Sequence, residues 1–270
     1  CTVVNCVPTM FLAMLSKENF SPARLKTLRI GVIAGAGYSV EDFLYVQNTI
    51  GSHFTLMSSL GQTECTAGLT VCNIDDPIEI KSTTVGHFMN HVEGKIADMN
   101  TGAPLPAGET GEICVRGYLT MQRYYGDAAE TAKTLDADGW VHTGDLGAMD
   151  ADGNITLKGR CKELIIRGGE NISPLEIEQA LAANPAVALC KVIGVPDRHF
   201  GEEVCACIIR APGAELDADA VRGWLRPRIA YFKIPRYVVF YDELPKTHKG
   251  AVSTAECKKL AMRDLFGTEG

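Results

Sequence analysis

The sequence has no apolar run of the roughly 18 to 20 residues that a membrane-spanning helix requires. Its first residues also lack the charged, apolar and small-residue order of a signal peptide. Positive charge is not in excess either, since 26 basic and 33 acidic side chains give a net charge of −7. We therefore expect a soluble protein that binds neither nucleic acid nor an anionic membrane, and in which any bound anion is held by local groups.

The ten cysteines lack the paired CxxC spacing and the Cys/His spacing of a metal site. Most are expected to be small buried hydrophobic residues. Cys205 and Cys207 lie in an alternating apolar segment, so both side chains share one face of a strand. Packing is the favoured interpretation of this pair, and a redox or metal element is the alternative. Thiols without a disulfide framework indicate a reducing compartment, either the cytoplasm or an organelle matrix.

Low-complexity tracts and internal repeats are also absent. Hydrophobic residues make up 46% and charged residues 22% of the 270 positions, an ordinary globular composition. At about 150 residues per domain, this length predicts one large or two medium domains. Residues 1–14 begin inside an apolar run without an initiator methionine, and we interpret them as mid-domain sequence with a further segment upstream.

The first part of the chain has the pattern of strand, turn and helix. An apolar segment over residues 28–33 ends at Gly35-Ala36-Gly37, and residues 40–50 can form a helix. A second apolar segment, residues 54–60, ends at the polar residues 61–64. Two strands thus deliver loops to one edge of a sheet, which is where α/β proteins bind ligands.

Residues 87–157 contain short alternating runs separated by turn signals such as Asp138-Gly139 and Asp152-Gly153. This pattern favours hairpins in a small β-barrel or an antiparallel sheet. Beyond Gly159 the pattern changes to that of a compact α+β unit with a short strand over 162–167. The domains are therefore predicted to span 1–160 and 161–270.

The first helix of the second unit has a recognisable start. Ser173 is the predicted N-cap, Pro174 occupies the first turn, and Glu176 at the third helical position completes a capping box. The helix is predicted to continue through Ala183. Two apolar strands over 188–195 and 203–210, a helix over 217–227 and a strand over 237–241 are expected to follow.

Thr143-Gly144-Asp145, with Arg160 further along, is the densest chemical signal. A carboxylate in a tight turn can accept hydrogen bonds from two vicinal hydroxyls, and a nearby guanidinium can brace the same sugar or its phosphate. Taken alone, the tripeptide is more simply a turn in which Asp145 makes a local hydrogen bond and Arg160 is a surface charge.

The combination of motifs changes this interpretation. The motifs are Gln62-Thr63-Glu64, Thr143-Gly144-Asp145, residues 159–178 and residues 245–250. In this order and spacing the sequence resembles the adenylate-forming superfamily, which includes acyl-CoA synthetases, beetle luciferases and peptide-synthetase adenylation domains. The resemblance covers nearly the whole chain. Residues 168–174 and 201–206 are most similar to fatty acyl-CoA synthetases, particularly the medium-chain type.

The resemblance implies a fold and an activity. The expected fold is α/β and α+β: the C-terminal part of a large AMP-binding, acyl-adenylating domain, made of a sheet and a small β-barrel, followed by a small mobile α+β domain. Such enzymes activate a carboxylic acid with ATP and Mg2+ to form an acyl-adenylate and pyrophosphate. They then transfer the acyl group to the thiol of coenzyme A, leaving AMP. ATP or AMP, Mg2+, coenzyme A and a small carboxylic acid are therefore the expected ligands.

The resemblance also implies roles for individual residues. Thr63 is expected to contact phosphate and Glu64 to hold Mg2+, which agrees with the preference of Mg2+ for carboxylate oxygens. Asp145 is expected to bind the ribose hydroxyls. The other nucleotide-pocket residues implied are Gly35, Ala36, Gly37, Leu60, Gly61, Gln62, Leu157 and Arg160. Gly37 and Leu60 depart from the family pattern, which often has proline or a small polar residue at the first position and an aromatic residue at the second.

Lys162 matches the hinge about which the smaller domain of such enzymes swings between the two half-reactions. This movement brings Gly168 and Gly169 to the tunnel that admits the pantetheine arm of coenzyme A. Glycine suits a narrow channel because it places no Cβ on the wall.

Two departures imply impaired adenylation. The family has a lysine at position 251 that contacts the reacting carboxylate and the α-phosphate, and this sequence has Ala251. Lys249, two residues earlier, is a weak substitute, because contacts of this kind require close placement. The family's phosphate-binding loop is also expected upstream of Cys1, and no such stretch occurs in this sequence.

We therefore predict an ATP-dependent acyl-CoA synthetase, an acid–thiol ligase, that transfers acyl groups better than it forms adenylates. A non-catalytic fragment that retains a nucleotide or coenzyme A surface is one alternative, and a peptide-synthetase adenylation domain is another. Luciferase-type oxidation is less favoured. His142 is a candidate general base, although a lone histidine in a β-rich segment is more often structural.

Overall fold

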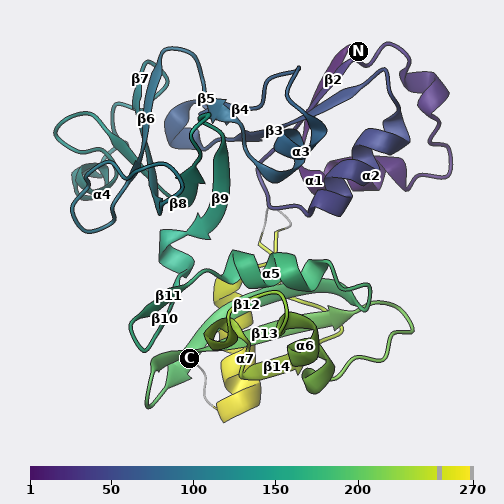
Figure 1. Ribbon diagram of the computed structural model, residues 1–270, viewed down its shortest axis with the longest axis vertical. Coiled ribbons are helices and arrows are strands. Elements are labelled where there is room, and N and C mark those ends of the chain that lie inside the picture. The colour runs from purple at the N-terminus through teal and green to yellow at the C-terminus, as the bar shows by residue number, and fades with distance from the viewer. Residues whose placement is uncertain (248–250, 268–270) are drawn as a thin grey trace. The chain divides into compact units, whose positions relative to one another are not determined.

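The computed structural model describes residues 1–247 and 251–267. The chain folds into two compact units, residues 1–158 and 159–270 (Figure 1). None of the helices in the described residues combines the length and the apolar character that a membrane span needs.

The first unit begins with a five-stranded sheet of order β1-β2-β3-β4-β5. Its elements are β1 (Val3–Cys6), α1 (Pro8–Leu15), β2 (Ile30–Ile33), α2 (Val40–Ile50), β3 (Thr55–Leu60), β4 (Thr70–Val71), α3 (Ile78–Thr83) and β5 (His87–Phe88). The first three strands are parallel, whereas β4 and β5 are antiparallel to their neighbours. The predicted strand, turn and helix over residues 28–50 is confirmed, because β2 leads through Gly35 into α2.

Helices α1 and α2 pack against this sheet, and their buried apolar side chains form a core with those of β2 and β3. Phe11 from α1 and Phe43 from α2 are both fully buried there, together with Ile33 of β2 and Leu56 of β3. Ser39 caps α2 by accepting a hydrogen bond from the Asp42 N–H, and the Asp42 carboxylate completes the capping box. Local capping and burial of one helix face thus hold the helices against β2 and β3, the strands from which the two loops leave.

A second sheet of order β6-β7-β8-β9 completes the unit. Its strands are β6 (Val92–Ala97), β7 (Thr110–Gly117), β8 (Val141–Met149) and β9 (Ile155–Arg160), with α4 (Ala128–Thr134) between β7 and β8. The division between the units falls within β9, between Lys158 and Gly159.

The small barrel that the resemblance implies is wrong, whereas the antiparallel sheet that the pattern of residues 87–157 also allowed is confirmed. Among the described residues this sheet is open, and its end strands β6 and β9 are not neighbours in it. The Val85 N–H donates to the Ile155 carbonyl, and the Ile155 N–H donates to the Gly86 carbonyl. Both backbone groups of Ile155, the first residue of β9, are therefore bonded to the segment before β5 and not to β6.

The second unit has a sheet of order β11-β10-β13-β12, with β14 also paired to β13. Its elements are β10 (Ile165–Arg167), β11 (Glu170–Ile172), α5 (Pro174–Ala182), β12 (Val187–Asp197), β13 (Gly201–Arg210), α6 (Ala218–Leu225), β14 (Tyr237–Phe240) and α7 (Thr254–Phe266). The α+β pattern predicted beyond Gly159 is confirmed.

Strand β13 buries both of its faces. Val204, Ala206 and Ile208 enter a core shared with α5 and α6, whereas Cys205 and Cys207 enter a core shared with α7. Both cysteines are fully buried. Hydrogen bonding to Cys205, followed by burial, raises the pKa of Cys207 well above its ordinary value, so this thiol stays protonated. The packing interpretation of this pair is therefore confirmed.

The predicted capping box at α5 is wrong. Ser173 occupies the N-cap position, but its side chain makes no capping hydrogen bond. The Glu176 carboxylate lies 2.7 Å from the Lys233 ammonium instead. A full positive charge is a stronger partner for a carboxylate than a neutral backbone amide.

Candidate functional site

The loops after β2 and β3 leave the sheet at the same edge, because these strands are parallel and adjacent. The first loop holds Gly35 at φ +82°, a left-handed conformation that favours glycine, while a Cβ at Gly37 would meet no atom within 4 Å. Residues Gly35, Ala36 and Gly37 are all exposed. The sequence therefore correctly predicted two polar loops at one edge of a sheet.

The loop after β3 is tightly closed. A Cβ at Gly61 would lie 1.6 Å from the Ala67 carbonyl oxygen, so this position requires glycine. The Cys65 and Ala67 N–H groups both donate to the Gln62 carbonyl, and Thr66 and Ala67 have positive φ angles. Such backbone conformations in non-glycine residues persist only where the surroundings hold them, and they often mark functional sites.

Glu64, which is half-buried, is held by the segment that follows β7. The Tyr124 hydroxyl donates to Glu64 Oε1 at 2.6 Å, and the Met121 N–H donates to the Glu64 carbonyl at 2.7 Å. Thr63, beside it, is exposed. A carboxylate and an adjacent hydroxyl are oxygen donors that fit a hard cation and a phosphate respectively. No sequence pattern indicates Tyr124, because it contacts Glu64 from a segment 60 positions further along the chain.

Asp145 lies in a bulge of β8, where the register between β7 and β8 shifts. The Thr143 hydroxyl donates to the Ile113 carbonyl at 2.7 Å and accepts from the Asp145 N–H at 3.1 Å. Gly144 has φ +71°, and its N–H donates to Glu112 Oε1 at 2.9 Å. Glu112, which no sequence motif marks, thus supports the turn that carries Asp145.

Asp145 and the loop after β3 are brought together in the first unit. Burial raises the pKa of Cys65 to about 11, opposed by a hydrogen bond from Gln62, and the negative charges of Glu64 and Asp145 add to the increase. Both carboxylates therefore act on one thiol at the centre of the loop, and Asp145 is itself buried. Leu60, at the end of β3, packs against the core beneath this site.

The remaining predicted residues lie on β9 and beyond it. Leu157 is half-buried against the core of the first unit, and Arg160 is the exposed last residue of β9. Lys162 is exposed in a 3-10 turn, Cys161–Glu163. Arg160 and Lys162 thus follow directly after the division between the two units, whereas Leu157 precedes it.

Gly168 and Gly169 form the turn between β10 and β11, with φ angles of +58° and +90°. A Cβ at Gly168 would lie 3.0 Å from the Phe200 ring, whereas one at Gly169 would meet no atom within 4 Å. The turn thus has open space on one side, and the guanidinium of Arg167 stacks over Phe200, with its carbon 4.0 Å from the ring centre.

Ala251 is exposed. The Thr247 N–H donates to the Ala251 carbonyl at 2.7 Å, and Lys246 pairs with Val252 in an antiparallel bridge. Lys249, the weak substitute for the missing lysine, lies outside the described residues.

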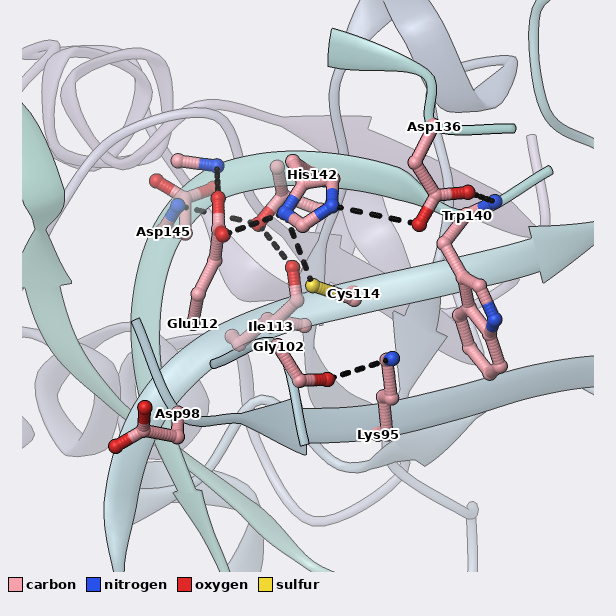
Figure 2. Close-up of polar contacts among 12 residues, drawn as sticks. Lys95, Asp98, Gly102, Glu112, Ile113, Cys114, Asp136, Trp140, His142 and Asp145 are labelled. Atoms are coloured by element: carbon pink, nitrogen blue, oxygen red, sulfur yellow. Dashed lines mark hydrogen bonds and ion pairs between the residues drawn. The ribbon is translucent and has the colours of Figure 1, made fainter. Parts of the chain in front are cut away.

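His142 does not have the surroundings of a general base. Its Nδ1 lies 2.7 Å from Glu112 Oε2, and its Nε2 lies 3.7 Å from Asp136 Oδ2 (Figure 2). Both ring nitrogens therefore face carboxylates of this sheet, and the structural interpretation of His142 is favoured over the catalytic one.

Thr143→Val is expected to lower the free energy of unfolding of the first unit by about 2 kcal/mol. Valine keeps the size of the side chain, but the Ile113 carbonyl loses its donor and the Asp145 N–H loses its acceptor in a buried site. Urea denaturation followed by circular dichroism measures the change. Thr110→Val at the exposed start of β7 is the matched control, and equal effects of the two substitutions would contradict this account.

Tyr124 is expected to titrate above its ordinary pKa. The hydrogen bond to Glu64 is the largest cause, because ionisation would place a phenolate beside a carboxylate. Glu64→Gln should return the pKa toward its ordinary value. NMR titration of tyrosines labelled with 13C at Cζ measures this, with the fully exposed Tyr125 as an internal reference. If the Tyr124 pKa is unchanged in Glu64→Gln, the hydrogen bond between Tyr124 and Glu64 is refuted.

Comparisons with known proteins agree with this geometry. The family of AMP-binding enzymes matches residues 1–125, and the AMP-binding enzyme C-terminal domain matches residues 176–251. The putative acyl-CoA synthetase YngI of Bacillus subtilis (strain 168) is 40% identical over 252 residues, which cover 93% of this chain and 46% of that protein. The human mitochondrial medium-chain acyl-CoA ligase ACSF2 is 35% identical over 258 residues, covering 96% of this chain and 42% of that protein.

Solved structures have the same fold. ATP-bound MatB from Rhodopseudomonas palustris superposes with a TM-score of 0.88 at 31% identity, over 97% of this chain and 51% of that one. The o-succinylbenzoate CoA synthetase MenE of Bacillus subtilis, in complex with ATP and magnesium ion, has a TM-score of 0.81 at 27% identity, over 94% of this chain and 51% of that one. The chain belongs to the adenylate-forming superfamily of AMP-binding enzymes, and it spans about half the length of the relatives it matches.

Proposed function

We propose that the protein containing this chain is an AMP-forming acyl-CoA synthetase that acts on a medium-chain fatty acid. The observation that carries the proposal is the pairing, within one compact unit, of the Asp145 turn with the loop of Thr63 and Glu64. The relatives named above as acyl-CoA synthetase or medium-chain acyl-CoA ligase support the reaction class and the acyl length.

In this proposal residues 1–160 belong to the large AMP-binding domain, and 161–270 form the small mobile domain. The buried Asp145 carboxylate accepts hydrogen bonds from the two ribose hydroxyls, while Thr63 donates to phosphate. Glu64 holds Mg2+, which when bound supplies positive charge to the phosphate oxygens. The other nucleotide contacts come from the loops at 35–37 and 60–62 and from β9.

The second half-reaction uses the small domain. Lys162 is the hinge, and the turn of Gly168 and Gly169 lines the path of coenzyme A. The thiol sulfur attacks the acyl carbon of the adenylate, its proton leaves to solvent, and AMP departs with the electrons of the broken acyl–phosphate bond. Ala251 puts no cation at the family's lysine position, so adenylate formation is slow while acyl transfer is retained.

Supplying acyl-adenylates of several lengths with coenzyme A separates the two half-reactions. Mass spectrometry then quantifies acyl-CoA against a control with ATP and free acid. We expect thioester from medium-chain adenylates and far less from ATP and acid. Efficient turnover of ATP and acid would refute the impairment, whereas no thioester from any adenylate would refute acyl transfer and favour a non-catalytic binding fragment.

A glycine pair sharpens this test. Gly169→Val places a side chain in the open space beside the turn, and Gly213→Val imposes similar backbone strain at an exposed turn where a Cβ also meets no atom within 4 Å. If the turn lines the path of coenzyme A, Gly169→Val abolishes thioester formation and Gly213→Val does not. Equal rates of thioester formation in the two variants would show that Gly169 does not line the path of coenzyme A.

The Mg2+ site has its own readout. Mn2+ bound in place of Mg2+ is expected to broaden the ring signals of Tyr124 more than those of Tyr125, because the Tyr124 hydroxyl contacts Glu64 directly. Glu64→Gln should abolish the selective broadening. Equal broadening of the two tyrosines, or broadening that survives Glu64→Gln, would place the ion elsewhere.

A further inference from the structure

Three side chains of the second sheet converge on one point (Figure 2). Glu112 and Cys114 lie two residues apart on β7, and His142 is the cross-strand partner of Cys114 on β8. His142 Nδ1 lies 2.7 Å from Glu112 Oε2 and 3.6 Å from Cys114 Sγ. The three potential ligand atoms all lie within 4.8 Å of one another.

We propose that Glu112, Cys114 and His142 bind a divalent transition-metal ion of the Zn2+ class. Thiolate, imidazole and carboxylate together suit Zn2+ and disfavour Mg2+ or Ca2+, which prefer oxygen ligands. Ligand distances of about 2.0 to 2.3 Å in a tetrahedral site place neighbouring ligand atoms roughly 3 to 4 Å apart. The Nδ1 to Sγ distance of 3.6 Å already meets this requirement.

The carboxylate needs only a small adjustment. Glu112 Oε2 and His142 Nδ1 are at hydrogen-bond distance, so the metal ion takes the place of the proton that lies between these two atoms. The thiol proton of Cys114 passes to solvent, the imidazole carries its one proton on Nε2 so that the Nδ1 lone pair binds the ion, and no electron is transferred. Three protein ligands leave a fourth position for water, and the side chain of His142 is 30% exposed, which provides an entry path.

Surrounding groups hold the ligands in the orientation that a metal site requires. Metal-ligating histidines usually direct their second ring nitrogen at a carboxylate, and ligating carboxylates are themselves hydrogen-bonded. Asp136 Oδ2 lies 3.7 Å from His142 Nε2, and the Gly144 N–H donates to Glu112 Oε1 at 2.9 Å. Both supports come from residues outside the ligand set.

The charges near the cluster favour a cation. Two carboxylates, Glu112 and Asp136, flank His142, and a Cys114 thiolate adds a third negative charge. Lys95 is the partner of Cys114 on β6, but its ammonium donates to the Gly102 carbonyl at 3.0 Å and lies over the Trp140 ring.

The test titrates the metal-free chain with Zn2+, followed by dialysis and elemental analysis, and with Co2+, followed by the thiolate-to-cobalt charge-transfer absorption. We expect one tightly bound ion per chain and a charge-transfer band. Cys114→Ala should abolish the band, and His142→Gln should weaken binding at least 100-fold. Asp136→Asn should weaken it about 10- to 100-fold.

Controls separate the site from the other nine cysteines. Cys72→Ala removes a buried thiol elsewhere in the same unit and should leave the band and the affinity unchanged. His142→Gln alters a partly exposed residue, so it keeps the test decisive if Cys114→Ala does not fold. The proposal would be overturned if no ion bound tightly, or if the charge-transfer band persisted in Cys114→Ala. It would also be overturned if His142→Gln bound the ion as tightly as the parent chain, or if Cys72→Ala lost as much affinity as Cys114→Ala.

Discussion

Asp145→Ala is expected to weaken AMP binding about 100-fold. The proposed role gives the carboxylate two hydrogen bonds from ribose hydroxyls, and bonds to charged groups contribute about 1.5 to 3 kcal/mol each. A loss of about 3 kcal/mol corresponds to roughly two powers of ten in Kd. Isothermal titration calorimetry with AMP measures the change.

A double-mutant cycle isolates the ribose contact. The 2′,3′-dideoxy analogue of AMP lacks both hydroxyls, so it should bind the parent chain weakly and lose little more on Asp145→Ala. Asp138→Ala, at an exposed turn of the same sheet, is the matched control and should bind AMP normally. If Asp145→Ala weakens AMP and the dideoxy analogue equally, the carboxylate stabilises the turn and does not bind ribose.

Ala251→Lys is expected to raise the rate of acyl-adenylate formation by about 10² to 10³. A fixed cation facing the charge that develops on the carboxylate and α-phosphate should be worth about as much as one oxyanion-hole donor. The substitution should not cost stability, because the Ala251 side chain is exposed and its backbone carbonyl, which accepts from the Thr247 N–H, is unchanged. Pyrophosphate release from ATP and acid, measured in the protein that contains these residues, reports the rate.

Two controls test whether a positive charge at position 251 is required, as opposed to a long side chain there or an added charge elsewhere. Ala251→Met supplies a long neutral side chain, and Ala255→Lys adds the same charge at an exposed site in α7. Neither should accelerate adenylation, and acyl transfer from a supplied adenylate should change little in any of the three variants. Equal acceleration by Ala251→Met, or none by Ala251→Lys, would remove position 251 from the adenylation step.

Local patterns predicted most of the secondary structure. The helix over residues 40–50 is α2 with the same bounds, since its apolar spacing lies within the segment and its cap, Ser39, directly precedes it. The strands near 54–60 and 203–210 are also present as β3 and β13. The strand predicted over 162–167 is shorter, because residues 161–163 form a 3-10 turn before β10.

Local predictions failed where a residue far along the chain competed with the local partner. The capping box of α5 is wrong because Glu176 finds Lys233, a residue 57 positions away. The barrel is wrong because β9 bonds to the segment at 85–86. In each case a partner far along the chain displaced the one that the local pattern suggested.

The candidate site divides in the same way. The motifs marked Glu64 and Asp145 as candidates, because the turn residues around each are contiguous in sequence. Tyr124 and Glu112 were missed, since they reach Glu64 and Gly144 across 60 and 32 positions. Their side chains carry no motif that marks them.

The sequence by itself determined the helices, the strands and the loops that carry the motifs, because hydrophobic periodicity, capping and turn preferences act over a few neighbouring residues. Only the tertiary structure decided which side chains support those loops and that Glu112, Cys114 and His142 meet. Strand pairing and register bring such residues together, and a shift of one residue would turn each side chain to the opposite face of the sheet.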